Sequence, residues 1–217
     1  MSPEPRIQLC AFKDGFCEAS AHICAARNEL CALDAVAGDG DLGVTLAVGF
    51  EHVRVMLNEL AAADVGEMLT GVGSQLARSA PSTIGTLMAS GFLRAGEALK
   101  GVTRLESRDV VLMLEATCSG VSARGGANVG ERTVLDAMNA AAVAAEEASV
   151  AGAGPEEVLV SAATAAEVGA NATASMEPRH GRAVWLRDRA LGNKDAGAAA
   201  WAIYLAGLAE GCRQSAT

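Results

Sequence analysis

The sequence predicts an all-α protein, a single domain spanning residues 1–217 and built from eight antiparallel helices. Half of the 217 residues are apolar, yet only 3% are aromatic, and alanine supplies much of the remainder. Alanine is the best helix former, whereas the β-branched and aromatic residues that favour strands are comparatively scarce. Apolar side chains also recur at helical spacing in segments joined by short connections, a pattern typical of up-and-down helix packing. We expect no sheet.

The first two predicted helices each have a regular apolar stripe. The first is expected over about residues 7–33 and ends at the turn GDGD, and the second begins near residue 42. Their core-facing side chains, three or four positions apart, are Phe12, Phe16, Ile23, Leu30, Leu46, Phe50, Val53 and Leu57.

Cys10, Cys17, Cys24 and Cys31 recur every seven residues along the first helix. Successive members of this stripe would lie about 10 Å apart at 1.5 Å rise per residue. That separation is too large for a disulfide, which needs Cα atoms within about 7 Å, and too large for one zinc ion. We therefore expect small buried thiols along a contact between helices.

Capping residues and prolines bound the other helices. Asp64 is a suitable N-cap for a helix that stops before Pro81, and Ser107 with Asp109 opens another. Pro155 suits the first turn of a helix, and Asp195 is expected to cap the last one. The expected ranges are about 65–79, 83–99, 107–122, 134–149, 155–176 and 195–212.

Charge and hydropathy exclude several classes of function. A formal charge of −9 argues against nucleic acid, whose phosphates require a basic face. The first residues, MSPEPRIQLCAF, have charges where a secretory signal needs an uninterrupted apolar core. The longest apolar run, 196–209, has 14 residues and is shorter than the roughly 20 that span a bilayer. We expect a cytoplasmic protein that does not enter membranes.

Three carboxylates are crowded into the segment LDAVAGDGDLGVT. Asp34, Asp39 and Asp41 surround Gly38 and Gly40, whose backbones can adopt conformations closed to other residues. Oxygen ligands this close repel one another unless a hard cation lies among them, and Mg²⁺ is the usual one. Asp and Gly are also ordinary turn formers, but a simple turn does not need three acids. The spacing favours a metal and phosphate site.

Four loops combine glycine with polar side chains: LDAVAGDGDLG, SAPSTIGT, RGGANVGERT and GRAVWLRDRALGNKDAG. They follow the first, third, fifth and seventh helices, so in an alternating bundle they meet at one end and predict a ligand site there. Simpler interpretations stay open for the individual loops. Ser82 or Thr83 could be a plain N-cap, and Arg182 could pair weakly with Asp195 in solvent. Trp185 and Trp201 are expected to pack rather than to stack on a base.

With these loops in order, the whole chain resembles the L subunit of dihydroxyacetone kinase, a Dak2-type nucleotide-binding domain. The segments that carry the resemblance are LDAVAGDGDLG, PSTIGTLMASGFLRAG, RGGANVGERTVLDAM and GRAVWLRDRALGNKDAGA. The resemblance implies a barrel of eight antiparallel helices with the nucleotide at one mouth. It also implies a kinase subunit that binds ADP or ATP.

The resemblance assigns roles to individual residues. Asp34, Asp39 and Asp41 would hold two Mg²⁺ ions that bridge the nucleotide phosphates. Two groups would approach the phosphates: Leu42, Gly43, Val44 and Thr45, and then Thr83 and Ile84 with Ser79 and Ser82 close by. Gly125 and Val134 would border the adenine, and Arg182, Asp195, Ala196 and Gly197 would close the pocket.

The family also implies partners. A K-type subunit holds a small ketose covalently through a histidine, and no segment here resembles it. Phosphate would come from ATP or, through bound ADP, from a phosphohistidine phosphotransferase protein; a homodimer is one candidate assembly. Many family members have histidine at Leu42, asparagine at Thr45, proline at Ala196 and GGASG where this chain has PSTIG. A regulatory protein that binds nucleotide without transfer is therefore the alternative, ahead of a scaffold with no ligand.

Overall fold

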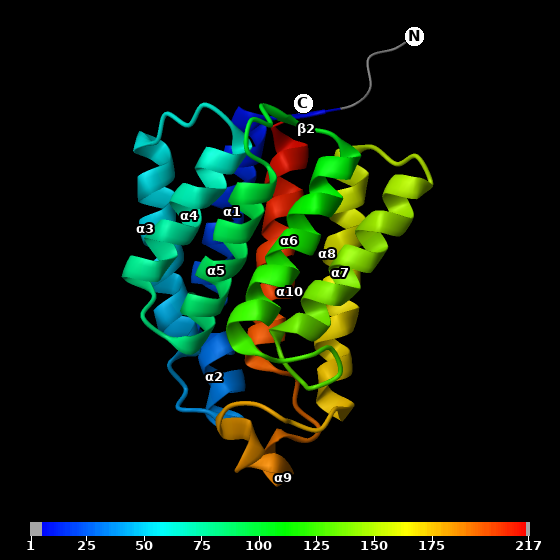
Figure 1. Cartoon of the computed structure of the whole chain (residues 1–217). Helices are drawn as coiled ribbons and strands as arrows, with labels where there is room; N and C mark the ends of the chain where they lie inside the picture. The colour runs from blue at the N-terminus through cyan, green and yellow to red at the C-terminus, as the bar shows by residue number, and fades with distance from the viewer. Residues whose placement is uncertain (1–5, 216–217) are drawn as a thin grey trace.

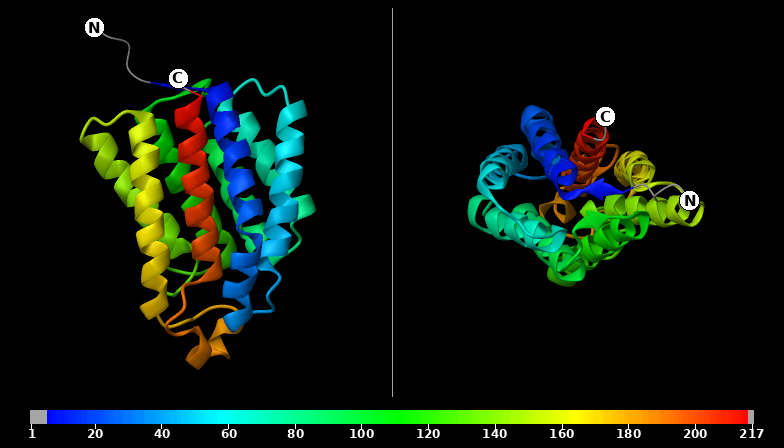
Figure 2. Two further views of the ribbon diagram at one scale, coloured as in Figure 1. Left: turned by 180° about the vertical axis from the view of Figure 1, so that it is seen from behind. Right: turned by 90° about the horizontal axis from the view of Figure 1, so that it is seen from above.

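The computed structural model describes residues 6–215 and shows eight helices in a closed ring (Figures 1 and 2). Neighbours around the ring follow chain order, each antiparallel to the next, and the last packs against the first. This confirms the all-α bundle of eight antiparallel helices. The ring comprises α1 (Leu9–Ala25), α3 (Leu42–Glu59), α4 (Val65–Ser79), α5 (Thr83–Ala98), α6 (Ser107–Gly125), α7 (Val134–Val150), α8 (Pro155–Ala172) and α10 (Ala196–Gln214).

The expected capping residues and Pro155 set the starts of three of these helices, α4, α8 and α10. Asp64 accepts a hydrogen bond from the Glu67 N–H at 2.8 Å and begins α4, and Asp195 accepts from the Ala198 N–H at 2.8 Å and begins α10. Pro155 is the first residue of α8. At α6 the N-cap is Glu106, and the Asp109 carboxylate accepts from the Glu106 N–H at 2.8 Å.

The first predicted helix is two helices. It breaks at Ala26 (φ −82°, ψ 3°), and α2 (Arg27–Ala37) continues beyond the expected end at residue 33, below α1 in Figure 1. A Cβ at Gly43 would lie 2.0 Å from the Arg27 carbonyl oxygen, so the start of α3 packs directly on the start of α2. This tertiary contact leaves no mark in the local sequence pattern. Because α2 extends to Ala37, Asp34 lies on a helix and not in the turn that follows it.

The seventh predicted helix is shorter than expected. It ends at Ala172 and is followed by the 3₁₀ turn η1 (Thr173–Ser175). The chain then makes an excursion over residues 176–195 that contains η2 (Arg182–Val184) and the one-turn helix α9 (Arg187–Ala190), at the bottom of Figure 1.

A two-stranded antiparallel ladder joins β1 (Ile7–Gln8) to β2 (Arg104–Leu105), so the expectation of no sheet is wrong to this small extent. Ile7 pairs with Leu105, and both side chains are buried. The ladder therefore closes the core at the end of the ring that carries the two chain termini (Figure 1). Residues 1–5, within the stretch expected to lack a secretory signal, lie outside the described residues.

Aromatic side chains meet at the centre of the ring. Tyr204 lies 5.1–5.6 Å, between ring centroids, from Phe16, Phe50, Phe92 and Trp201. Trp201 is 2% exposed and packs as expected. The packing prediction is wrong for Trp185, which is 87% exposed.

The cysteines are free thiols. The prediction that the stripe is buried is wrong for Cys10, which is exposed, whereas Cys17, Cys24 and Cys31 are half-buried. The Cys24 thiol donates to the Ala47 carbonyl at 3.5 Å, which places this part of the stripe against α3. Within residues 6–215, no helix has both the length and the apolar character needed to cross a membrane.

Candidate functional site

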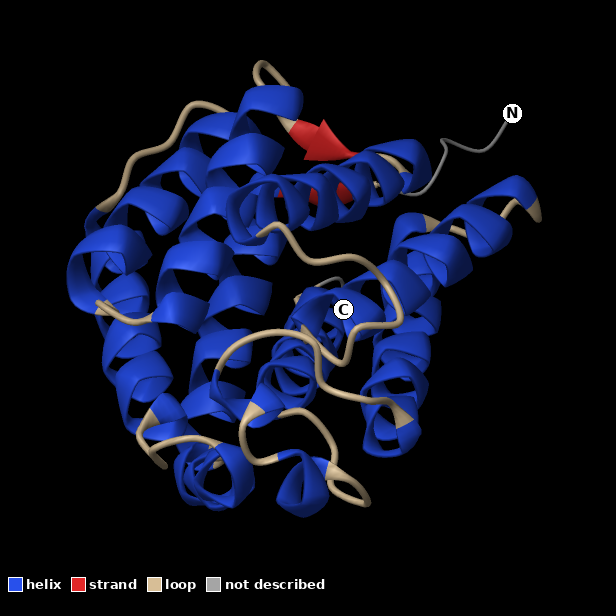
Figure 3. Ribbon diagram, turned by 60° about the horizontal axis from the view of Figure 1, so that its bottom comes forward, coloured by secondary structure: helices blue, strands red, loops and turns tan. Residues whose placement is uncertain are grey.

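The four glycine-bearing loops lie together at the end of the ring opposite the chain termini, facing the viewer in Figure 3. They are residues 38–41, 80–82, 126–133 and 173–195. The alternating direction of the helices predicts that the four loops meet at one end of the bundle, and the structure confirms this prediction.

The three aspartates form one cluster. Carboxylate oxygens of Asp34, Asp39 and Asp41 all lie within 4.8 Å of one another. Asp34 is on α2 and accepts from the Gly40 N–H at 2.8 Å and from the Leu42 N–H at 3.4 Å, so its carboxylate folds over the turn. Gly40 has φ +78°, a conformation that favours glycine.

Charge is not balanced within this cluster. Desolvation and then the nearby negative charge of Asp39 raise the pKa of the Asp41 carboxyl. Desolvation acts in the same direction on Asp39, but a hydrogen bond donated by Arg182 holds the pKa of the Asp39 carboxyl below its usual value. Two adjacent acids are thus perturbed in opposite directions, and one cationic side chain compensates part of the repulsion.

The donor set fits Mg²⁺. Ligands of one octahedral Mg²⁺ lie about 3–4 Å apart because each bond is about 2.1 Å. The carboxylate oxygens of the cluster all lie within 4.8 Å of one another, so small side-chain adjustments would bring them to this spacing. Desolvation and then repulsion by Asp39 raise the pKa of Asp41, and a divalent cation would relieve the repulsion. The carboxylates are partly exposed, which leaves room for water or a phosphate to complete the coordination.

Two helix N-termini face this end. Leu42, Gly43, Val44 and Thr45 form the first turn of α3, directly after Asp41. Thr83 and Ile84 begin α5, where the Ser82 hydroxyl accepts from the Gly85 N–H at 3.2 Å. This bond bears out the N-cap interpretation of Ser82, and it leaves the hydroxyl proton free to donate. The Ser79 hydroxyl instead donates to the Gln75 carbonyl at 2.8 Å.

Residues from three loops converge on Gly197. A Cβ there would lie 3.2 Å from Asp195 Oδ1, 3.3 Å from Ile84 Cδ1 and 3.5 Å from Val134 Cβ. The starts of α5, α7 and α10 therefore meet at one point, with Ala196 buried beside it. Gly125 lies at the end of α6, where a Cβ would be 3.0 Å from Leu87 on α5.

Arg182 connects the fourth loop to the first, because its guanidinium donates to Asp39. The simpler interpretation left open for this loop, a weak pairing of Arg182 with Asp195, is therefore wrong, because Arg182 pairs with Asp39 instead. Burial raises the pKa of Asp195 to about 6, although the Ala198 N–H and the charge of Arg132 favour the ionised form. The predicted residues of all four loops are thus brought together at one end.

Three residues at this end were missed by sequence reasoning. Arg132 and Glu131 hold the excursion 176–195, and the buried Thr173 hydroxyl accepts from the Asp195 N–H at 2.8 Å. Thr133 was not missed, because Thr133-x-x-Asp136 is a readable capping box, in which Asp136 accepts from the Thr133 N–H at 2.7 Å. No local pattern identifies the other three.

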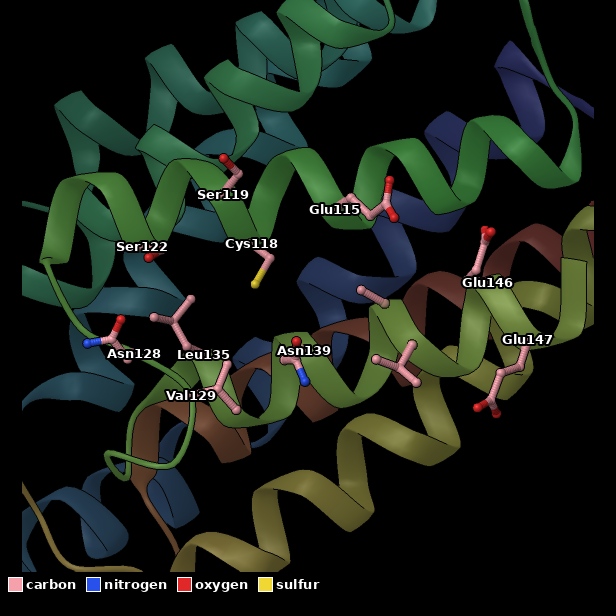
Figure 4. A pocket seen from close by; sticks show the side chains of 12 residues that line it. Glu115, Cys118, Ser119, Ser122, Asn128, Val129, Leu135, Asn139, Glu146 and Glu147 are labelled. Carbon is pink, nitrogen blue, oxygen red and sulfur yellow. The ribbon is translucent and has the colours of Figure 1, made fainter.

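A groove of about 630 Å³ lies between α6 and α7 (Figure 4). Its floor includes Cys118 and Leu135, and Glu115, Glu146 and Glu147 lie at its far end. None of the predicted nucleotide residues lines it, although its near end adjoins the 126–133 loop.

A second group of potential metal ligands lies outside the ring. Glu18 and His22 on α1 face Glu210 on α10, with His22 Nε2 3.4 Å and 3.3 Å from the two carboxylates. The three side chains are partly exposed, and their contacts are those of an ordinary ion-pair cluster.

A ring of eight helices with an acidic, Mg²⁺-compatible cluster at one mouth defines the class: an all-α protein whose loops gather candidate metal ligands at one end. The chain belongs to the DAK2 domain family, whose model matches residues 36–210. Within that family it is of the L-subunit type found in dihydroxyacetone kinases.

Relatives of known function support this assignment. The chain is 31% identical over 169 residues to the "PEP-dependent dihydroxyacetone kinase, ADP-binding subunit DhaL" of Escherichia coli, covering 78% of this chain and 80% of the relative. It is 31% identical over 199 residues to the L-erythrulose 1-kinase of Mycolicibacterium smegmatis, covering 89% of this chain and 34% of that longer protein.

Solved structures agree. The native dihydroxyacetone kinase of C. freundii matches with a TM-score of 0.75 at 26% identity, covering 97% of this chain and 36% of that one. The same kinase in complex with AMP-PNP and Mg²⁺ matches with a TM-score of 0.74 at 25% identity.

Proposed function

We propose that this chain is the nucleotide-binding subunit of a dihydroxyacetone-kinase-like enzyme. It binds ADP or ATP through two Mg²⁺ ions at Asp34, Asp39 and Asp41, and it acts with a K-type subunit that holds a small ketose. The observation that carries the proposal is the cluster of three carboxylates within 4.8 Å at the loop end of the ring. The ADP-binding relative and the AMP-PNP and Mg²⁺ complex support the same ligand chemistry.

Each group of residues at this end would bind a different part of the nucleotide. Bound Mg²⁺ would neutralise charge on the phosphate oxygens, which is the main requirement of phosphoryl transfer. The N–H groups at the starts of α3 and α5 would orient the phosphates. Val134 and Gly197 offer an apolar surface suited to the nucleoside where the starts of α7 and α10 meet, and Ile84 at the start of α5 would lie on the phosphate side. The phosphate source and a homodimeric assembly stay predictions.

Calorimetry tests the binding step. We expect ADP and ATP to bind in the presence of Mg²⁺ and not after chelation. Asp41→Asn is expected to weaken Mg²⁺-dependent affinity by at least about 10-fold, because it removes a ligand charge from the cluster. Glu210→Gln removes one carboxylate from the outer cluster and is the matched control, expected to bind normally. Wild type giving no Mg²⁺-dependent heat contradicts the proposal.

A mixing experiment tests the transfer step. With a K-type protein, dihydroxyacetone or erythrulose, and either ATP or a phosphohistidine donor, we expect a phosphorylated ketose. Nucleotide binding without transfer in any combination favours the regulatory alternative. The half-buried Leu42 at the start of α3, where many family members have histidine, is the feature that keeps this alternative in view.

A further inference from the structure

Arg132 has an unusual backbone. Among residues 6–215 it is the non-glycine residue with a positive φ, +59°, and its side chain is buried, with 6% of the residue exposed. Glycine adopts this conformation freely, whereas an L side chain rarely does. A buried arginine at such a position indicates that its side chain has a role that compensates the strain.

The guanidinium of Arg132 binds the end of the excursion 176–195. Nη2 donates to the Ala190 carbonyl at 3.0 Å and to the Asn193 carbonyl at 2.9 Å. Ala190 ends α9, and Asn193 lies two residues before Asp195. One side chain of the 126–133 loop therefore fixes the path that leads into α10.

Glu131 binds the beginning of the same excursion. Its carbonyl accepts from the Arg179 N–H at 3.4 Å, and its carboxylate contacts the His180 ring. Between these two anchors the chain is largely exposed and carries Arg182 and Trp185, below the ring in Figure 1. Residues 131 and 132 thus hold both ends of the segment. Its other contacts include the ion pair of Arg182 with Asp39 and the hydrogen bond from the Gly192 N–H to the Ala174 carbonyl at 2.9 Å.

We propose that Arg132 is a positioning residue for the nucleotide: by holding the Ala190 and Asn193 carbonyls, it keeps Arg182 and the start of α10 in place at the mouth. This rests on the proposed function, in which Arg182, Asp195 and Gly197 border the ligand. Arg182 faces Asp39, and Gly197 faces Ile84 and Val134, so a displaced excursion would remove contacts on both sides of the site. A pre-ordered segment reduces the entropy lost on binding.

Arg132→Gly is the central variant, because glycine keeps the φ of +59° while the guanidinium is lost. We expect its dissociation constant for ADP with Mg²⁺ to rise by at least about 10-fold. Without nucleotide, trypsin should cleave faster after Arg187 and Arg189, which are exposed within the excursion. Arg132→Lys, which retains charge and donors, should recover part of both properties. Arg108→Met is the control for loss of a positive charge, since Arg108 is an exposed partner of Glu146 on the ring wall.

The proposal is overturned if Arg132→Gly binds ADP with wild-type affinity or is cleaved at the wild-type rate. A second comparison assays wild type and Arg132→Gly at temperatures equally far below their respective melting temperatures. If their affinities for ADP are then equal, Arg132 only stabilises the fold, and the proposal is overturned. If Arg132→Gly does not fold, Arg132→Lys is used in its place: weaker ADP binding and faster cleavage than in wild type support the proposal, and wild-type values of either overturn it. If wild type binds no ADP, the proposed function fails, while the cleavage comparison still tests the anchoring of the excursion.

Discussion

At the scale of single residues, Gly38 shows how closely the acid cluster is built. A Cβ at this position would lie 2.2 Å from Asp34 Oδ1 and 2.8 Å from the Asp34 carbonyl oxygen. Gly38→Ala must therefore displace the carboxylate that accepts from Gly40 and Leu42. We expect Mg²⁺-dependent ADP affinity to fall by at least about 10-fold in calorimetry, with a loss of about 1–2 kcal/mol in unfolding free energy.

Gly71→Ala is the matched control for this variant. Its Cβ would meet nothing closer than Leu60 Cδ2 at 3.4 Å, and it lies inside α4, where alanine is favoured by about 0.5–1 kcal/mol. It should be more stable than wild type and bind ADP unchanged. Equal affinities for Gly38→Ala and Gly71→Ala would contradict the role given to Asp34.

Asp195 predicts a pH dependence of stability. Desolvation raises its pKa to about 6 in the folded protein, from 3.8, so between these values the folded state holds a proton that the unfolded state has lost. Stability should therefore fall as pH rises from about 4 to 6 and stay lower above that range. Asp195→Asn keeps a good N-cap and should gain about 1–2 kcal/mol at pH 7.

Urea unfolding of the ligand-free protein at pH 4.5 and pH 7 measures this difference. Asp195→Asn should show a shallower decline in unfolding free energy between the two pH values than wild type. An identical decline, or a variant that is less stable than wild type at pH 7, would exclude the assignment of the perturbed pKa to this carboxyl.

At the scale of elements, local chemistry predicted where most helices begin. Asp64, Pro155 and Asp195 act within one turn of the chain, so their positions could be inferred without tertiary information. The break at Ala26 could not be inferred in this way, because it accompanies the packing of Arg27, at the start of α2, against Gly43, sixteen positions further along the chain. The end of α8 was missed for a similar reason: directly after it, the Thr173 hydroxyl accepts from the Asp195 N–H and the Ala174 carbonyl accepts from the Gly192 N–H, about twenty positions away.

The close packing of α1 on α10 leads to a prediction about stability. A Cβ at Gly207 would lie 2.6 Å from the Ala19 Cα and 3.0 Å from the Ala19 nitrogen, so no side-chain movement can accommodate it. Gly207→Ala must move one helix against the other, and we expect a loss of about 1–3 kcal/mol. Ala206→Ser, on the exposed side of α10, should change stability little.

Urea denaturation of both variants tests this packing. The transition midpoint of Gly207→Ala should fall while that of Ala206→Ser stays near wild type. A wild-type midpoint for Gly207→Ala would mean that α1 and α10 are not packed as described.

At the scale of the whole molecule, the alternating direction of the helices is the feature that best predicts where the candidate site lies. Loops after every second helix of an antiparallel ring emerge at one end, so the sequence pattern alone predicts that Asp34, Thr83, Val134 and Gly197 lie near one another. The roles of Arg132 and Glu131 were not predictable, because their partners lie about 50 to 60 positions away. A single domain and the ligand roles of the individual residues stay predictions.

Nucleotide binding at the mouth should stabilise the entire ring, because the four loops assemble only in the folded state. A ligand present at 100 times its dissociation constant adds about 2.7 kcal/mol, which for a chain of this size raises the melting temperature by roughly 5–10 °C. We expect this rise with ADP and Mg²⁺ together and not with ADP and a chelator. At the same ligand concentration, Asp41→Asn should show at most about half of this rise, because its affinity is at least about 10-fold weaker. Its ligand-free form should nevertheless melt at or slightly above wild type at pH 7. The reason is that burial and the charge of Asp39 raise the pKa of Asp41 in the fold, so ionised Asp41 is unfavourable there. A ligand-free Asp41→Asn protein that melts well below wild type would show that the ionised Asp41 carboxylate stabilises the fold without a bound cation.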